Sequence, residues 1–260
     1  MKQLSISKRK QLLVALKQYR KKFLIGKSTE LDEAATRLMI NSFLSDVLGF
    51  ISIEEIKTEY MIRGTYADYV IQIKGKRYFI VEAKAMSIAL SEKHLRQVIN
   101  YAANEGIDWA LLTNGRQFQL YKVLFNKPIE SCKVLSVDLG DESQLKNAVE
   151  GFQHMTKYLL PKRGLDHLWN RFLALEVSNF SKLLYSSKII GHLKRQLKKT
   201  FKTKFSDDDI ITAITKVIVD EVRDVNPRKE RKHKKHSRRN KSKLTAVLQV
   251  QAPLITVSPN

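Results

Sequence analysis

The segment that decides the fold is residues 56–84, IKTEYMIRGTYADYVIQIKGKRYFIVEAK. Apolar and polar side chains alternate along it with a period of two, which is typical of β-strands that bury one face. Glycines interrupt the alternation at Gly64 and Gly75, and short glycine-containing turns join antiparallel strands. The segment therefore predicts a three-stranded antiparallel meander, with strands at residues 56–62, 66–73 and 77–84.

Helices are predicted before the meander. Apolar side chains recur at helical spacing over residues 5–24, with Lys and Arg between them, and again from about residue 30 to residue 48. Ser28 or Thr29 is expected to cap the second of these helices, and Gly49 to end it.

A helix and further strands are predicted after the meander. Helical spacing returns over residues 90–104, and an apolar strand follows at 108–113. Asn114-Gly115 is a strong hairpin signal that leads into a returning strand at 117–125, and a short strand is expected at 132–138. The order of helix, three strands, helix and strand predicts an α/β fold.

The rest of the chain is predicted to be helical up to a basic tail. The expected helices lie near residues 141–160, 164–185, 187–203 and 206–224. The predicted parts are a basic amphipathic helix at 1–27, an α/β domain at 28–139, a helical domain at 140–226 and a low-complexity tail at 227–260.

The net charge of +21 over 260 residues indicates a polyanionic partner, and nucleic acid is the commonest one. The charge is concentrated in the flanks. Residues 1–27 carry nine Lys and Arg and no acid, and residues 228–243 carry ten and one acid. The basic side chains between residues 194 and 204 form either a solvated helix face or a surface that contacts phosphates.

Several classes of protein are excluded or disfavoured. Cys132 is the single cysteine, so neither an internal disulfide framework nor a multi-cysteine zinc site can form. A reducing compartment is expected, and we predict a cytoplasmic location. No apolar run is long enough to cross a bilayer, and the first residues lack the layout of a signal peptide, so no membrane association is expected.

Asp68 and Glu82 are the candidate site residues within the meander. Residues two apart on a strand share a face, so Glu82 and Lys84 are expected to point the same way. Asp68 would meet Glu82 if the two strands pair across the Lys74–Lys76 turn. Two adjacent carboxylates repel each other, so burying them is costly unless a cation neutralises their charge. A hard divalent ion such as Mg²⁺ can do so, because it prefers oxygen ligands. The alternative is that these are ordinary surface charges on a hairpin.

Residues 30–125 resemble the nuclease domain at the N-terminus of type I restriction enzyme R subunits, within the PD-(D/E)xK superfamily. The resemblance is carried by four stretches, DEAATRLMINSFLSDVLGF, EY before YADYVI, FIVEAKA and QVINYAANEGIDWALLTNGRQFQLY. It implies a restriction-endonuclease-like core in the 28–139 domain, with an all-helical part and a basic tail after it.

The resemblance also implies roles for individual residues. Asp68 and Glu82 match metal ligands, and Lys84 matches the catalytic lysine. Glu33, in preference to Glu30, matches the acid on the opening helix. Gln97 and Tyr101 match a QxxxY element that lies near the metal site, and their spacing of four places them on one helix face. Mg²⁺ is the implied cofactor, and Mn²⁺ is expected to substitute for it.

The predicted function is a metal-dependent nuclease that hydrolyses phosphodiester bonds in DNA, with a role in restriction or defence suggested by the resemblance. The alternative is a catalytically inactive nuclease fold that binds nucleic acid through its basic flanks. Neither a partner protein nor a homodimer can be assigned from the sequence.

Overall fold

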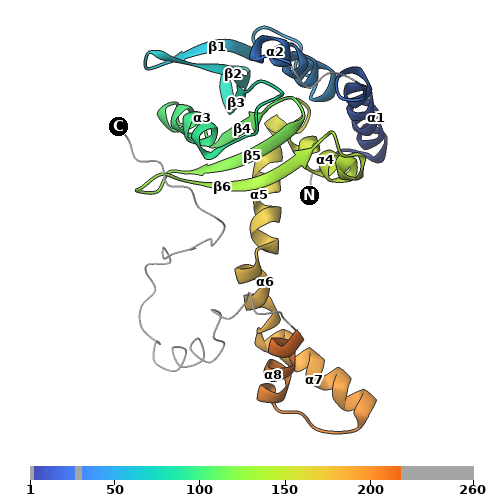
Figure 1. The fold of residues 1–260 in the computed structure, drawn as a ribbon. Helices are drawn as coiled ribbons and strands as arrows, with labels where there is room; N and C mark the ends of the chain where they lie inside the picture. The colour runs from blue at the N-terminus through green and yellow to red at the C-terminus, as the bar shows by residue number, and fades with distance from the viewer. Residues whose placement is uncertain (1–2, 27–30, 218–260) are drawn as a thin grey trace. The chain divides into compact units, whose positions relative to one another are not determined.

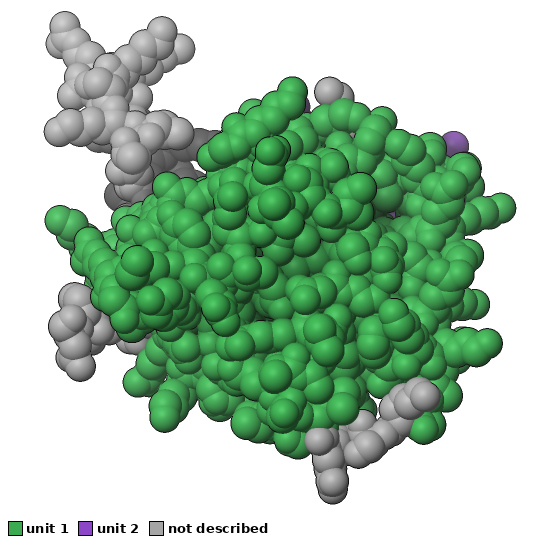
Figure 2. All heavy atoms as spheres, turned by 90° about the horizontal axis from the view of Figure 1, so that it is seen from above, with its two compact units in different colours: residues 1–170, 251–260 green, residues 171–250 purple. Residues whose placement is uncertain are grey.

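The computed structural model describes residues 3–26 and 31–217. The chain divides into two compact units, which are coloured separately in Figure 2. Unit 1 comprises residues 1–170 with 251–260, and unit 2 comprises residues 171–250. The sequence analysis predicts a domain boundary near residue 140, and its division of the chain into four parts stays a prediction. The basic tail predicted at 227–260 lies outside the described residues.

Unit 1 is built on a six-stranded sheet whose strands follow the order of the sequence (Figure 1). Neighbouring strands pair antiparallel, except that β3 and β4 pair in parallel. Helix α3 (Glu92–Asn104) joins these two strands, because parallel neighbours require a crossover connection. The strands are β1 (Ile56–Ile62), β2 (Thr65–Ile73), β3 (Lys76–Ala83), β4 (Trp109–Thr113), β5 (Gln117–Leu124) and β6 (Glu130–Asp138). The α/β class predicted from the sequence is therefore confirmed.

Two tight turns set the register of the predicted meander. Arg63 and Gly64 have φ angles of 48° and 82°, and Lys74 and Gly75 have φ angles of 51° and 77°. Two consecutive positive φ angles are typical of type I′ turns, whose twist matches that of the strands they join. The three strands of the meander begin and end within one residue of the predicted positions.

The two faces of the sheet bury different clusters of apolar side chains. Phe79 and Val81 of β3 lie in a cluster with residues of α1 (Ile6–Phe23), α2 (Glu33–Ser42) and α4 (Leu145–Phe152). Ile80, which lies between them, belongs instead to a cluster with Val98 and Ile99 of α3. Because side chains alternate along a strand, α3 covers one face and the other three helices cover the opposite face (Figure 1).

The second predicted helix, at residues 30–48, has a different start and a different last turn. Asp32 caps α2, since its Oδ1 accepts a hydrogen bond of 2.7 Å from the backbone N–H of Ala35. The predicted caps, Ser28 and Thr29, lie outside the described residues. The helix continues as the π-helical segment η1 (Phe43–Val47), and Gly49 with a φ of 86° follows it as expected.

The segment after β6 is divided into short helices where the sequence predicted one. It contains η2 (Glu142–Gln144), α4, η3 (Gln153–Met155) and η4 (Leu160–Lys162). Phe152 of α4 packs against Phe43 and Phe118, with ring centroids 5.1 and 5.5 Å away. These contacts make the segment part of the core of unit 1.

Unit 2 is helical in its described residues. Helix α5 (Gly164–Leu175) begins within the residues of unit 1 and ends within those of unit 2. The single helix predicted at 164–185 is wrong, because α6 (Val177–Leu184) is a separate helix that begins after Glu176, whose ψ is 137°. Helices α7 (Ser187–Phe201) and α8 (Asp207–Val217) follow, with a small core around Ile190, Ile210 and Ile211. In the described part of the chain, no helix combines the length and apolarity that a membrane span requires.

Candidate active site

The β2–β3 pairing brings Asp68 and Glu82 together, as the sequence predicted. Tyr69 pairs with Val81 in the antiparallel register, so Asp68 and Glu82 are the next residues along each strand. The backbone N–H of Ala83 donates a hydrogen bond of 2.8 Å to Oδ2 of Asp68. Asp68 is 7% exposed and Glu82 is 2% exposed, so both carboxyl groups are buried.

Burial of these two acids has an electrostatic consequence. Burial, followed by the charge of Asp68, raises the pKa of Glu82 to about 7, although the hydrogen bond from Lys84 acts in the opposite direction. Oε2 of Glu82 is buried and has no hydrogen-bond partner among the described residues. A buried acceptor without a partner is costly, and such groups are concentrated at functional sites.

Lys84 lies directly beside the acids. Its Nζ is 2.6 Å from Oε1 of Glu82 and 3.8 Å from Oε2 of Glu33 on α2. Burial acts to lower the pKa of Lys84, but the hydrogen bond to Glu82 and the neighbouring carboxylates outweigh it and raise this pKa. The sequence therefore predicted correctly that Glu82 and Lys84 point the same way.

Arg37 is a member of this cluster that the sequence analysis missed. Its Nη2 is 2.6 Å from Oδ1 of Asp68 and 3.1 Å from Oε1 of Glu33. Its backbone carbonyl accepts a hydrogen bond of 3.0 Å from the Tyr69 hydroxyl on β2. The available signal was its position one helical turn after Glu33, which places both side chains on one face of α2. We name Glu33, Arg37, Asp68, Glu82 and Lys84 the charge cluster.

A cavity of about 260 Å³ lies next to the charge cluster. It is lined by Arg37, Glu59, Tyr66, Ala67 and Asp68. Glu59 lies opposite Asp68 in the β1–β2 register and has a φ of 46°. A left-handed conformation is uncommon in a residue other than glycine, and at a strand position it re-aims the side chain. The cavity gives access to one side of Asp68.

The charge cluster fits a divalent metal ion in part. Asp68 and Glu82 offer carboxylate oxygens, which hard cations prefer, and Oε2 of Glu82 has no other partner among the described residues. Glu33 and Asp68 fit less well, because partners hold both of their oxygens in this arrangement. Arg37 and Lys84 hold those of Glu33, and Arg37 and the N–H of Ala83 hold those of Asp68. Among residues 3–26 and 31–217, no three His, Cys, Asp or Glu side chains are grouped so that they could hold a metal ion.

Gln97 and Tyr101 lie together on α3, as their spacing predicted. Nε2 of Gln97 donates a hydrogen bond of 3.1 Å to the Tyr101 hydroxyl, and Tyr101 packs in the apolar cluster under α3. Within the described residues, neither side chain bonds to Asp68, Glu82 or Lys84. Burial, followed by the charge of Lys84, lowers the pKa of His94 in the first turn of the same helix.

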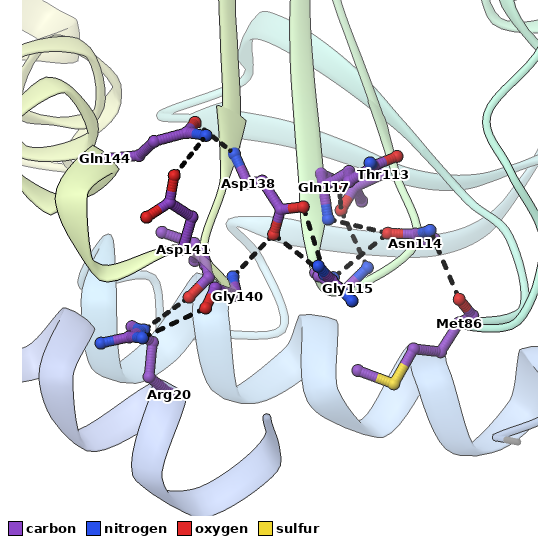
Figure 3. Close-up of polar contacts among 12 residues, drawn as sticks. Arg20, Met86, Thr113, Asn114, Gly115, Gln117, Asp138, Gly140, Asp141 and Gln144 are labelled. Atoms are coloured by element: carbon purple, nitrogen blue, oxygen red, sulfur yellow. Dashed lines mark hydrogen bonds and ion pairs between the residues drawn. The ribbon is translucent and has the colours of Figure 1, made fainter. Parts of the chain in front are cut away.

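The backbone after Lys84 is held by neighbouring elements. The N–H of Lys84 donates to the carbonyl of Thr113 at the end of β4, at 2.9 Å. The Asn114 side chain donates to the carbonyls of Met86 and Ile88, and Figure 3 shows the first of these bonds beside the β4–β5 turn. The N–H of Met86 donates to Oγ1 of Thr36 on α2, at 3.1 Å. The position of Lys84 therefore depends on both β4 and α2.

The fold and this geometry define a mixed α/β domain with two buried carboxylates and a lysine on adjacent strands. Residues 32–133 match the family model described as the type I restriction enzyme R protein N terminus. The matched segment contains the whole charge cluster together with Gln97 and Tyr101. The resemblance predicted from the sequence is thus confirmed for this segment.

Two solved structures are similar to part of the chain. The cryo-EM structure of a DrdV–DNA complex is 17% identical over 54% of this chain, with a TM-score of 0.39. The crystal structure of the type IIG restriction endonuclease BpuSI is 21% identical over 54% of this chain, with a TM-score of 0.32. The chain spans only 14% and 18% of the lengths of these two proteins. No match was found among the curated proteins.

Proposed function

We propose that residues 31–138 form a metal-dependent nuclease domain that hydrolyses phosphodiester bonds in DNA. The family match supports a DNA nuclease in restriction. The observation that carries the proposal is the buried pair of Asp68 and Glu82, with Nζ of Lys84 2.6 Å from Glu82. Such a group of charges is costly to bury unless it has a function or a ligand that compensates for it.

Each member of the charge cluster has a distinct role in this proposal. Asp68 and Glu82 would hold Mg²⁺, or Mn²⁺ in its place, and Glu33 would contribute from α2. When bound, the ion supplies Lewis acidity toward the scissile phosphate and toward a water molecule. Lys84 stabilises the negative charge that develops on the phosphate, because a cation fixed in a dry site needs little reorganisation.

The surroundings of the charge cluster complete the proposal. Gln97 and Tyr101 would orient the nucleic-acid strand or support the ligands from α3. Arg37, which neutralises Asp68 in this arrangement, would be available to a phosphate once the carboxylates bind another cation. The cytoplasmic location remains the prediction made from the single cysteine. The family match transfers the nuclease domain and not the partners of a type I complex.

The alternative function is that of an inactive nuclease fold that binds nucleic acid through its basic flanks. The ion pairs that hold Glu33, Asp68 and Glu82 favour this alternative, since a neutralised cluster is also a plausible structural core. The two functions differ in whether the cluster binds a divalent ion.

Cleavage is tested with supercoiled plasmid, linear DNA and RNA in Mg²⁺, Mn²⁺ or excess EDTA. We expect cleavage of DNA that requires the ion, and its loss in Asp68→Asn, Glu82→Gln and Lys84→Ala. The exposed residues Glu54 and Lys93 provide matched controls, as Glu54→Gln and Lys93→Ala should keep full activity. Cleavage in excess EDTA, or full activity in Lys84→Ala, would overturn the mechanism.

Metal binding is tested independently by calorimetric titration with Mn²⁺. We expect heat of binding in the native chain and its loss in Asp68→Asn, while DNA binding in EDTA stays unchanged. If the native chain binds neither Mg²⁺ nor Mn²⁺ and still binds DNA, the inactive alternative is the correct one.

A further inference from the structure

Among the described residues of unit 2, positive charge is concentrated on α7 and the segment after it. Residues 187–204 carry seven Lys and Arg and no Asp or Glu. Helix α7 packs Ile190, Leu193 and Leu197 into the small core it shares with α8. The spacing of Gly191, Lys194, Arg195 and Lys198 places these residues together on another side of the same helix.

A groove of about 350 Å³ lies along this basic side. It is lined by Gly191, Lys194, Arg195, Lys198, Lys204, Phe205 and Asp207. Lys194 pairs with Asp207 at 2.8 Å. In the described part of the chain, Arg195, Lys198 and Lys204 make no ion pair. Asp207 offsets only one of the four cations in the groove, so the remaining positive charges repel one another and an anion bound there relieves the repulsion.

Two features separate this groove from an ordinary solvated helix face. The helix dipole favours a cation such as Lys198 in the last turn of α7. It does not account for Arg195, which lies before that turn, or for Lys204, which lies beyond the helix. Gly191 leaves the groove open, since a Cβ built there would have Nη1 of Arg195, at 3.7 Å, as its nearest neighbour. The groove therefore has both space and charge for a phosphate group.

We propose that the α7–α8 groove binds the phosphate backbone of duplex DNA without reading its sequence. The proposal rests on the proposed function for the identity of the polyanion. Cations that contact phosphates supply affinity and position, whereas base contacts supply specificity. A membrane surface is disfavoured, because the apolar side of α7 is occupied by the core with α8 and is not available for insertion into lipid.

The groove is tested in the full-length chain by measuring DNA affinity in EDTA over a series of salt concentrations. Each phosphate neutralised contributes about 0.9 to the slope of log K against log salt. We expect the double variant Arg195→Gln/Lys198→Gln to make this slope shallower by about 2. Lys182→Gln, an exposed lysine on α6, removes charge from the same unit outside the groove and should leave the slope unchanged.

A second pair of variants tests the groove without removing a cation. Gly191→Glu places a carboxylate in the groove and should weaken DNA binding, while Gly191→Ala should leave it unchanged. Alanine and glutamate both have a higher helix propensity than glycine, so α7 should persist in both variants, as circular dichroism can verify. An unchanged salt slope in the double variant, or equal losses in Gly191→Ala and Gly191→Glu, would overturn the proposal.

The failure of this proposal differs from the failure of the proposed function. If the slope is unchanged but metal-dependent cleavage is present, the groove proposal fails and the nuclease stands. If the slope falls but no cleavage occurs, the groove binds DNA and the nuclease assignment fails. Binding of anionic vesicles that depends on Arg195 and Lys198, without any change in the DNA slope, would assign the groove to lipid and overturn the proposal.

Discussion

Replacing Arg37 by methionine is expected to destabilise unit 1 and to increase its response to a divalent ion. The substitution keeps an apolar stem on α2 but removes the cation 2.6 Å from Oδ1 of Asp68, whose side chain is 6% exposed. Asp68 would then keep the N–H of Ala83 as a hydrogen-bond donor while lying beside Glu82.

The magnitude follows from the burial of the pair. Breaking a fully buried ion pair costs about 3–5 kcal/mol. The side chain of Arg37 is 37% exposed, so solvent screening reduces the expected loss in the free energy of unfolding to about 2 kcal/mol. At the size of this chain, that loss corresponds to roughly 4–8 °C in the unfolding midpoint. A divalent ion present at about thirty times its Kd would restore about 2 kcal/mol.

The assay is urea unfolding followed by tryptophan fluorescence, in EDTA and in a range of Mg²⁺ concentrations. Trp109 and Trp169 both belong to unit 1, so the signal reports on the unit that holds the charge cluster. The control is Arg116→Met, which removes an exposed pair with Asp138 and should cost less than about 1 kcal/mol with no response to Mg²⁺. An Arg37→Met variant as stable as the native chain in EDTA, or one stabilised by Mg²⁺ no more than the native chain, would refute the reasoning.

Two further outcomes are expected. Gln97→Ala should reduce cleavage several-fold without lowering the midpoint of thermal unfolding. Tyr101→Phe removes the hydroxyl and keeps the buried ring, so it separates the roles of the two. Unchanged cleavage in both variants would assign the pair to packing. Deleting residues 228–243, which carry ten Lys and Arg and lie outside the described residues, should make the salt slope of DNA binding shallower by roughly 4 if about half of these side chains contact phosphates. Thermal stability should stay nearly constant in that deletion, and an unaltered slope would instead identify the tail as a solubilising or docking extension.

The parts of the fold that were predictable from the sequence depend on local interactions. The meander was predicted because alternation and two glycine-containing turns determine strands and register within about 30 residues. The same register places Asp68 beside Glu82, so the centre of the candidate site followed from the hairpin alone. The parallel β3–β4 pairing fits the predicted helix between them, because such a pair needs a crossover.

The parts that were missed depend on contacts between distant segments or on small departures from regular geometry. The π-helical turn at Phe43–Val47 inserts a residue that apolar periodicity does not reveal. The break at Glu176 carries no proline or glycine to signal it. Arg37 pairs with Asp68 from a different element, and neither residue indicates the other in the sequence. The spacing of Gln97 and Tyr101 places them on one face of α3, but the distance of that face from the charge cluster depends on helix packing, which spacing alone does not fix.

The anchoring of the backbone around Lys84 has a consequence for the energetics of ligand binding. The segment from Lys84 to Ile88 is bonded to β4, to the β4–β5 turn and to α2. Its conformational entropy is therefore lost when the chain folds and does not have to be lost again when a ligand arrives. On such a preorganised segment, less of the interaction energy between Lys84 and a bound ligand is offset by the entropy cost of ordering the backbone. The same side chain on a free loop would contribute less to ligand affinity and to the rate of a reaction. Substitutions at Asn114 or Thr36 would act on Lys84 from a distance, through its position and not through its charge.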